Sequence, residues 1–394
     1  MEALRTNGHA QSPPVLAAFA AVPREVFVPH ISAEEAYRDV SIPTKRLDDG
    51  EVVSSSSQPA IMAVMLEQLD VRPGHRVLEI GAGTGYNAAL LAHLVGPAGS
   101  VTTLDIDEDI VASAGAHLAA AGVTGVDVVC ADGWKGYDAG APYDRIILTV
   151  AAHDIAPAWH AQLARGGRLV LPFSLPAIQA SVAFEERDAG LESVSVRGCM
   201  FMRLRGSAAL AMRPVTVGSS PAARVWPRGE DRVDGAAVEA LIRAAADETP
   251  IATVASRDLH DGLVLWLGVH EPSSAWFTAP RDAASVAFVP ALFEGDEMRA
   301  SFGLFETNGI ALLFRMGTGA ENGRESVRLG MRTHGDPAVG ERLRGAVRAW
   351  DGAGRPGLGR LRVRAYPLGD PYLSPPGDAV LMRPCTRFVL DWPR

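Results

Sequence analysis

The chain has 394 residues, of which 47% are hydrophobic and 21% charged, and its formal net charge at pH 7 is −9. This length favours two domains, and the composition is that of a globular protein rather than a disordered one. The negative charge disfavours general nucleic-acid binding, because a phosphate backbone would be repelled.

Two further classes of protein are disfavoured by the sequence. No stretch has the roughly 18 consecutive apolar residues of a membrane span, and the N-terminus has no basic region followed by an apolar one. We therefore expect a cytoplasmic protein with no membrane partner. The 3 cysteines are far apart and the 10 histidines show no ligand spacing, so no metal site is expected.

A glycine-rich turn follows the first strand of the predicted sheet. Residues 77–86 read Val-Leu-Glu-Ile-Gly-Ala-Gly-Thr-Gly-Tyr and lead into an apolar helical run. Gly81, Gly83 and Gly85 let the backbone turn sharply and approach a ligand, because no Cβ occupies that space. The spacing differs from the dinucleotide fingerprint G-x-G-x-x-G, since the third glycine comes one residue early. With Glu79 just before the turn, this pattern predicts S-adenosylmethionine binding.

Acidic residues at the ends of later strands support the same ligand. Asp105 follows Gly85 by 20 residues, about where an acid grips ribose hydroxyls in doubly wound folds. Asp132 and Gly133 follow the next strand, where the carboxylate could accept the adenine amino group. Each acid taken singly could equally be a helix cap or a solvated turn. Three further strands are predicted, at residues 101–105, 126–130 and 143–150.

These elements predict a doubly wound Rossmann-like α/β domain over residues 1–213, with residues 1–75 on its substrate side. The turn-rich stretch from Arg213 to Pro221 is a candidate linker. Residues 222–394 are then expected to form a C-terminal α+β accessory domain.

The second segment has its own pattern of elements. Asp234 could cap a helix that continues to Ala246. Residues 301–305 and 310–314 flank Thr-Asn-Gly, which predicts a hairpin. Pro337 opens a helix with an apolar core stripe. A strand near residues 361–365 alternates apolar residues with arginines.

Seven arginines lie between Arg342 and Arg364 with few acids among them. They are interpreted as a solvated face, or alternatively as a contact surface for an acidic peptide.

Several stretches together resemble protein-L-isoaspartate O-methyltransferases. Over about residues 15–206, the resemblance rests on Val-Pro-Arg-Glu-Val-Phe-Val-Pro at 22–29, Ala-Tyr-Arg-Asp at 36–39, Ser-Ser-Ser-Ser-Gln-Pro at 54–59, Asp-Gly-Trp at 132–134 and, more weakly, Cys-Met-Phe-Met-Arg-Leu at 199–204. The family's Thr-Ile-Ser-Gln-Pro motif falls on this chain with its serine at Ser57. Two departures are Ser55 and Ser56 at the Thr-Ile positions, and Arg203 where proline is usual.

The resemblance implies a class I methyltransferase fold and assigns roles to residues. Ser57 is the implied catalytic residue, which would orient the acceptor oxygen; the alternative is that it caps the following helix. The implied substrate-binding residues are Ser56, Gln58, Phe201 and Met202. No metal is implied, because a carboxylate is ionised near pH 7 and needs no activated water.

The chain continues for 181 residues past Arg213, which resembles the extended relatives found beside lanthipeptide and graspetide pathways. That resemblance implies methylation of an aspartate in a ribosomally made, modified peptide, with collapse of the ester to succinimide and isoaspartate. The first alternative is repair of L-isoaspartyl residues in damaged proteins. A non-catalytic adenosylmethionine-binding scaffold is the alternative of another class, and a homodimer is possible.

Overall fold

The computed structural model describes residues 2–48, 50–187, 190–207, 214–218, 222–228, 234–243, 245–283, 287–321, 323–369 and 378–393. The chain folds into two compact units. The first comprises residues 1–174, 179–210 and 362–391, and the second comprises residues 175–178, 211–361 and 392–394. In the described part of the chain, no helix has the length and apolar character needed to cross a membrane.

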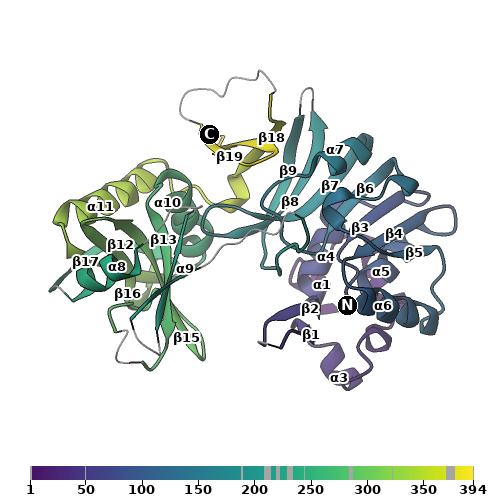
Figure 1. Cartoon of the computed structure of the whole chain (residues 1–394), viewed down its shortest axis with the longest axis horizontal. Helices are drawn as coiled ribbons and strands as arrows, with labels where there is room; N and C mark the ends of the chain where they lie inside the picture. Colours follow the sequence, from purple (N-terminus) through teal and green to yellow (C-terminus); the bar gives the residue numbers. More distant parts are fainter. Residues whose placement is uncertain are drawn as a thin grey trace. The chain divides into compact units, whose positions relative to one another are not determined.

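The first unit is built on a ten-stranded mixed sheet, in the order β19-β20-β18-β9-β8-β7-β6-β3-β4-β5 (Figure 1). Its strands are β3 (Arg76–Ile80), β4 (Ser100–Asp105), β5 (Val126–Cys130), β6 (Tyr143–Leu148), β7 (Leu163–Ser174), β8 (Gln179–Arg187), β9 (Gly190–Gly198), β18 (Arg362–Pro367), β19 (Ala379–Met382) and β20 (Thr386–Asp391). From β7 to β5 all pairs are parallel, and the remaining pairs are antiparallel.

Helices pack on the sheet because its parallel strands are apolar on both faces. The helices are α1 (Glu2–Thr6), α2 (Pro13–Ala21), η1 (Arg24–Phe27), α3 (Ala33–Ala36), α4 (Pro59–Leu69), α5 (Tyr86–Val95), α6 (Glu108–Ala120), η2 (Gly133–Lys135), η3 (Asp138–Gly140) and α7 (Pro157–Gln162). Residues of α1, α2, α4 and α5 share one core with Val77, Val101, Ile147 and Val170 of the sheet. The prediction of a doubly wound Rossmann-like domain is confirmed.

A separate two-stranded hairpin lies N-terminal to α4. It pairs β1 (Ile42–Arg46) with β2 (Val52–Ser56). The order of the parallel strands reverses at β3, with β4 on one side and β6 on the other. Ligands of doubly wound sheets bind outside the carboxyl ends of strands at such a switch point.

The second unit contains an eight-stranded antiparallel sheet with helices (Figure 1). Its elements are β10 (Val215–Val217), β11 (Ala223–Pro227), α8 (Gly235–Ile242), β12 (Ala246–Ala255), α9 (Ser256–Asp258), η4 (Leu259–Val264), α10 (Leu265–His270), β13 (Ser274–Pro280), β14 (Phe293–Glu294), β15 (Met298–Glu306), β16 (Gly309–Glu321), β17 (Arg324–Gly335), α11 (Pro337–Gly352) and η6 (Leu358–Arg360). The predicted hairpin, the helix opened by Pro337 and the cap Asp234 are confirmed.

Two expectations for the C-terminal half differ from the structure. The helix capped by Asp234 ends at Ile242, and Ala246 begins β12 instead. The predicted second domain, residues 222–394, included the last strands, whereas residues 362–391 belong to the first unit, because β18 hydrogen-bonds to β9. The candidate linker from Arg213 to Pro221 lies partly outside the described residues.

Candidate functional site

The glycine turn after β3 has a backbone that only glycine adopts easily. Gly81 has φ +105° and Gly83 has φ +52°. A Cβ on Gly81 would lie 2.4 Å from Thr149 Oγ1, so a side chain there would clash. The N–H groups of Gly81 and Ala82 both donate to the Leu104 carbonyl, which fixes the turn against the end of β4.

Gly85 has a different role from the first two glycines. It is the N-cap of α5 at φ +83°, and an added Cβ would lie 3.2 Å from the Ala114 carbonyl oxygen of α6. Gly85 therefore permits close packing of α5 on α6 and does not line the cavity described below. Of the three predicted glycines, Gly81 and Gly83 line the cavity, and contact of Gly85 with the ligand stays a prediction.

Glu79 lies beneath the turn and is fully buried. Its two carboxylate oxygens accept hydrogen bonds from Asn87 Nδ2 at 2.8 Å and Thr103 Oγ1 at 2.6 Å. Burial raises the pKa of Glu79 to about 7, although both hydrogen bonds oppose that rise. Glu79 is not among the residues that line the cavity described below, and its two hydrogen bonds support the turn; its contact with the cofactor stays a prediction.

Asp105 ends β4 beside the glycine turn. Its Oδ2 accepts from the Gly83 N–H at 3.2 Å, and its Oδ1 accepts from the Ile106 N–H at 2.9 Å. Burial raises the pKa of Asp105, and the backbone hydrogen bonds act against that rise. Because Asp105 also lines the cavity, its carboxylate is available to accept further hydrogen bonds from a ligand.

Asp132 and Gly133 follow β5 and are not among the residues that line the cavity, so their contact with the cofactor stays a prediction. Asp132 Oδ1 accepts from the Trp134 N–H, and Oδ2 accepts from the N–H and hydroxyl of Ser207. Burial would raise the pKa of Asp132, but these hydrogen bonds lower it below its ordinary value. Gly133 is buried against Ile80, where a Cβ would lie 2.3 Å from Cγ2. Both residues shape the end of β5, and neither lines the cavity.

The serine segment, Ser54–Ser57, begins in the last residues of β2 and leads into α4. Ser57 and Gln58 are half-buried, and Ser57 makes no hydrogen bond within the described part of the chain. Ser56 is 3% exposed, and its hydroxyl has no hydrogen-bond partner among the described residues. Asp39 holds this segment: its Oδ1 accepts from the Ala60 N–H at 2.9 Å and its Oδ2 from Gln58 Nε2 at 3.0 Å.

The segment after β9 is fixed to the sheet by paired hydrogen bonds. The Phe201 N–H donates to Gln179 Oε1 at 2.8 Å, and Gln179 Nε2 donates to the Phe201 carbonyl at 3.3 Å. The Ala151 N–H donates to the Met202 carbonyl, and the Leu204 N–H donates to the Ala151 carbonyl. Phe201 also packs against the main core. This segment is therefore tied to the sheet and to the core at several points.

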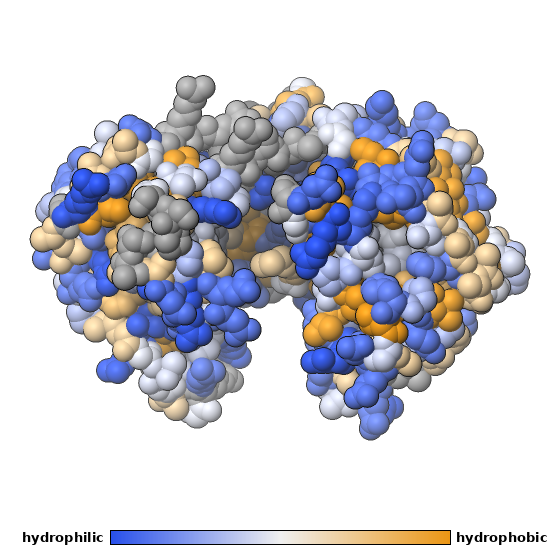
Figure 2. Space-filling model, turned by 60° about the horizontal axis from the view of Figure 1, so that its bottom comes forward, coloured by the Kyte–Doolittle hydropathy of each residue, from blue (hydrophilic) through white to orange (hydrophobic). Residues whose placement is uncertain are grey.

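A cavity of about 490 Å³ lies between these parts of the first unit. That volume is within the range of small-molecule sites. Eight of the predicted site residues line it: Ser56, Ser57, Gln58, Gly81, Gly83, Asp105, Phe201 and Met202. Met200, also in the lining, is 86% exposed. Figure 2 shows other apolar residues reaching the surface of this unit, on the right of the view, among hydrophilic ones.

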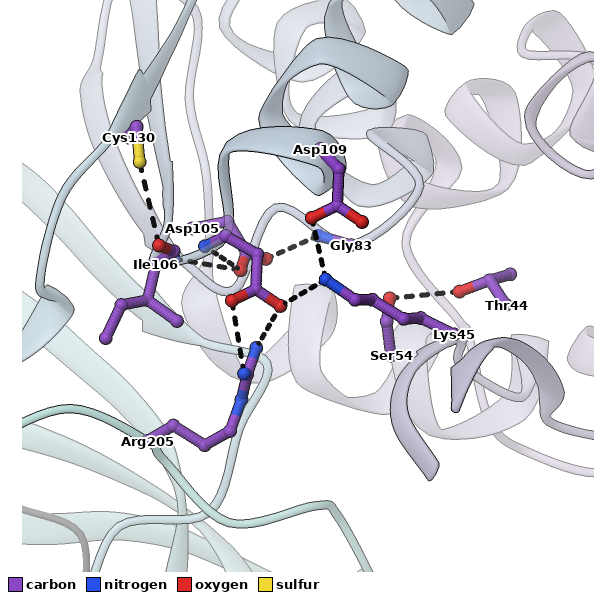
Figure 3. A network of polar contacts seen from close by, with 10 residues as sticks. Thr44, Lys45, Ser54, Gly83, Asp105, Ile106, Asp109, Cys130 and Arg205 are labelled. Atoms are coloured by element: carbon purple, nitrogen blue, oxygen red, sulfur yellow. Dashed lines mark hydrogen bonds and ion pairs between the residues drawn. The ribbon is translucent and has the colours of Figure 1, made fainter. Parts of the chain in front are cut away.

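An ion-pair network joins three segments next to the cavity (Figure 3). Lys45 of the hairpin bonds Asp107 at 2.8 Å and Asp109 at 2.7 Å, at the start of α6. Arg205 reaches Asp107 at 2.8 Å from the segment after β9. The network therefore links the hairpin and this segment to the carboxyl end of β4. Within the described ranges, no group of three or more His, Cys, Asp or Glu residues is placed to hold a metal ion.

The sequence did not identify the residues that hydrogen-bond to the segments lining the cavity. Arg24, Asp39 and Gln179 are each far in sequence from the segment that they contact. Arg24 and Asp39 lie in the motifs at 22–29 and 36–39, which were the available signal. Gln179 had no signal, because its partner is set by the pairing of β8 with β9.

Comparisons with known proteins give a consistent result. The family model described as protein-L-isoaspartate(D-aspartate) O-methyltransferase matches residues 1–209. A protein-L-isoaspartate O-methyltransferase of Methanoculleus marisnigri is 43% identical over 192 residues, which are 49% of this chain and 83% of the relative. One of Methanopyrus kandleri is 38% identical over 208 residues, or 52% of this chain and 89% of the relative.

The fold comparison extends over more of the chain. A solved structure titled protein-L-isoaspartate O-methyltransferase matches with a TM-score of 0.50 and 24% identity, covering 92% of this chain and 93% of that one. This likeness concerns the fold alone, and it reaches well beyond the residues that the family model matches.

Proposed function

We propose that this chain, which belongs to the protein-L-isoaspartate O-methyltransferase family, methylates L-isoaspartyl residues in damaged proteins and so begins their repair. The family model matches more than half of the chain, and relatives of this name are covered over most of their length. The chain is thus an S-adenosylmethionine-dependent O-methyltransferase. The proposed acceptor is the free α-carboxylate that an isoaspartyl residue carries where an ordinary residue has its peptide bond.

The observation that carries the proposal is the cavity at the carboxyl edge of the sheet. It brings Asp105 and the glycine turn together with the serine segment, although these are far apart in sequence. The residues fit the cofactor: Gly81 and Gly83 leave space for it, and Asp105 can accept hydrogen bonds from ribose hydroxyls. When bound, the cofactor supplies a methyl group on a positively charged sulfur.

The chemistry asks the protein for positioning rather than for acid or base catalysis. The acceptor carboxylate is already ionised at neutral pH, since the pKa of such a group is about 4. A carboxylate oxygen forms a bond to the methyl carbon, the carbon–sulfur bond breaks, and its electron pair remains on sulfur. No proton moves. A water-poor site that aligns the oxygen with the carbon–sulfur bond therefore favours the reaction.

We assign the alignment to the serine segment and to the residues after β9 that line the same cavity. The hydroxyls of Ser56 and Ser57 have no hydrogen-bond partner among the described residues, so both are free to donate to an acceptor oxygen. Gln58 lies beside them. Phe201 and Met202, which line the same cavity, supply apolar contact and limit access of water.

The comparisons favour isoaspartate over the aspartate of a maturing peptide. The named relatives all carry the isoaspartate name. The solved structure matches 92% of this chain, so the length beyond the methyl-transfer fold does not by itself point to peptide maturation. Membership of an enzyme family also disfavours the alternative that the chain is a non-catalytic adenosylmethionine-binding scaffold.

Paired synthetic peptides test the substrate. Two linear peptides identical except for isoaspartate or aspartate at one position, and a macrocyclic aspartyl peptide, would be incubated with labelled cofactor and followed by mass spectrometry. We expect methylation of the isoaspartyl peptide alone, and slower methylation of that peptide by the Ser57→Ala variant. Methylation of either aspartyl peptide in preference, with later loss of water, would contradict the proposal.

A further inference from the structure

A buried arginine lies directly behind one wall of the cavity. Arg24, at the start of η1, is 1% exposed. Its Nε donates to the Ala36 carbonyl at 2.7 Å. Its terminal nitrogens lie 3.5 Å from the Ser56 carbonyl oxygen and 3.8 Å from Met62 Sδ. The guanidinium group is therefore held inside the protein by neutral partners.

Three residues that this guanidinium contacts also line the cavity. They are Ser56, Met62 and Tyr86, whose ring centroid lies 5.2 Å from Arg24 Cζ. The positive charge of Arg24 is consequently one layer of residues away from a molecule bound beside Ser56. At such short range and with little intervening water, its field acts on that molecule with weak screening.

Within the described residues, Arg24 forms no ion pair with a carboxylate. The acid that acts on it through space is Asp39, and both oxygens of Asp39 already accept hydrogen bonds, from Ala60 and Gln58. Burial lowers the pKa of Arg24, yet an arginine stays protonated at neutral pH. A buried charge without an ionic partner is costly to the fold, which an apolar side chain of similar size would avoid.

We propose that Arg24 is a positioning residue whose charge draws the acceptor carboxylate to the serine segment. This inference rests on the proposed function only in that the acceptor is a carboxylate. An isoaspartyl and an aspartyl acceptor are both anions before methylation and neutral esters after it. Arg24 therefore attracts the substrate and does not attract the product.

The location of the charge predicts a specific kinetic signature. The negative charge of the carboxylate decreases as its oxygen bonds to the methyl carbon, so a cation stabilises the bound substrate at least as much as the transition state. Removing that cation should raise KM for the acceptor and leave kcat unchanged or slightly higher. A mere loss of structure would instead lower kcat and weaken all ligands.

The test compares ligands that differ only in charge. Arg24→Met removes the charge and keeps an unbranched apolar side chain, whereas Arg24→Lys keeps the charge. Arg38→Met removes an exposed arginine of the same region as a matched control. For each variant, KM and kcat would be measured with the acceptor peptide. Dissociation constants would be measured separately for that peptide and for its methyl ester, and only these binding measurements would contain S-adenosylhomocysteine.

In Arg24→Met we expect KM and the dissociation constant of the carboxylate peptide to rise about tenfold, which is about 1.4 kcal/mol. The ester should bind within twofold of wild type, Arg24→Lys should restore most of the preference for the carboxylate, and Arg38→Met should change neither. Equal weakening of carboxylate and ester, or no change in either, would overturn the proposal.

Folding is checked separately by S-adenosylhomocysteine binding. If Arg24→Met fails that check, Arg24→Gln replaces it, because glutamine retains an N–H donor for the Ala36 carbonyl. If both neutral variants fail to fold while Arg24→Lys folds, Arg24 serves stability and the proposal is wrong. Should the acceptor prove to be aspartate, the same measurements apply with that peptide, so the two proposals fail separately.

Discussion

At the scale of single residues, Glu79 and Asp105 lie near the same turn and have different surroundings. Glu79 is enclosed by Asn87 and Thr103, and its burial raises its pKa to about 7. Asp105 accepts backbone N–H bonds and faces the cavity. Glu79 therefore affects stability as a function of pH, whereas Asp105 is placed to contact a ligand.

Glu79→Gln should change how stability depends on pH. The pKa of Glu79 is about 7 in the folded state and near 4.3 in the unfolded state, so the folded state keeps the proton to a higher pH. The contribution of Glu79 to the free energy of unfolding therefore falls as pH rises between about 4.5 and 7. Relative to wild type, the variant should gain on the order of 2 to 3 kcal/mol of unfolding free energy from pH 5 to pH 8. Urea denaturation at both pH values measures this, with exposed Glu34→Gln as control. The prediction would be contradicted if the difference in unfolding free energy between Glu79→Gln and wild type were the same at pH 5 and pH 8.

Asp105→Ala should weaken cofactor binding. The variant leaves ribose hydroxyls and the Gly83 N–H without an acceptor, a loss on the order of 1 to 3 kcal/mol, or about 5- to 150-fold in dissociation constant. Calorimetry with S-adenosylhomocysteine measures it. Asp127→Ala, an exposed acid on the neighbouring strand β5, is the control. Unchanged affinity in Asp105→Ala would remove this residue from the site.

Ser57→Ala should lower turnover about 10- to 100-fold, which corresponds to losing one well-placed hydrogen bond to the acceptor. Cofactor affinity should stay within twofold, because Ser57 is assigned to the acceptor alone. Ser56→Ala is the informative comparison, since its hydroxyl is buried without a partner and lines the same cavity. Full activity in Ser57→Ala together with a defect in Ser56→Ala would move the assignment by one residue.

The spacing of the glycines located the turn after β3 correctly, but it could not show which residues of that turn line the cavity. Gly81, Gly83 and Asp105 line the cavity, whereas Gly85 packs on α6 and Glu79 points beneath the turn. Asp132 follows its strand as expected. Its carboxylate, however, accepts a hydrogen bond from the N–H of Ser207, which lies 75 residues later in the chain. Contacts of this kind depend on tertiary structure and leave no local pattern.

At the scale of elements, a distant acid caps the helix that follows the serine segment. The N-cap residue of α4 is Gln58, which makes no side-chain capping bond, and Pro59 has no N–H. The first available donor is the Ala60 N–H, which donates a hydrogen bond to Asp39 Oδ1. The position of the serine segment therefore depends on a residue about 20 positions earlier.

Asp39→Ala should destabilise the protein by about 1 kcal/mol, because a helix N-terminus loses its acceptor. Amide hydrogen exchange at Ala60 should become faster, while exchange in the central strands should change only as the global stability does. Denaturation and exchange measured on the variant test this, with exposed Glu34→Ala as control. Unchanged protection at Ala60 would show that the cap contributes nothing.

Elements fixed by local signals were predicted well, and those fixed by distant pairing were not. The helix from Pro337 to Gly352 buries the apolar stripe that its spacing indicated, including Val339, Leu343 and Trp350. The helix after Asp234 stops at Ile242 because the following residues pair with β17 as β12. Helical propensity alone could not reveal that competition.

At the scale of the whole molecule, the arginines between Arg342 and Arg364 do not form a free basic surface. Five of them pair with acids: Arg342 with Glu271 and Glu306, Arg344 with Glu341, Arg355 with Asp351, Arg362 with Asp391, and Arg364 with Asp378 and Asp391. Paired charges give a weak field at long range. Electrostatic steering of an acidic peptide by this cluster is therefore less well supported than the sequence indicated, and peptide selection by the second unit stays a hypothesis.

The strand arrangement also changes how that hypothesis can be tested. A chain that ends after Arg213 would lose β18, β19 and β20 from the sheet of the first unit, and with them Phe388, whose ring lies 4.5 Å from that of Phe173. It would expose the edge of β9, which invites aggregation. Loss of one buried phenylalanine already costs about 3 to 5 kcal/mol.

We therefore expect this truncated chain to be insoluble, or to melt at least about 10 °C below the full chain. Full-length Phe388→Ala should reproduce part of the loss, about 3 to 5 kcal/mol in denaturation, whereas Leu368→Ala, an exposed residue just after β18, should change stability by less than about 0.5 kcal/mol. If the truncated chain folds with an unchanged melting temperature and binds S-adenosylhomocysteine as the full chain does, then strands β18 to β20 are not part of the cooperative unit that forms the active site.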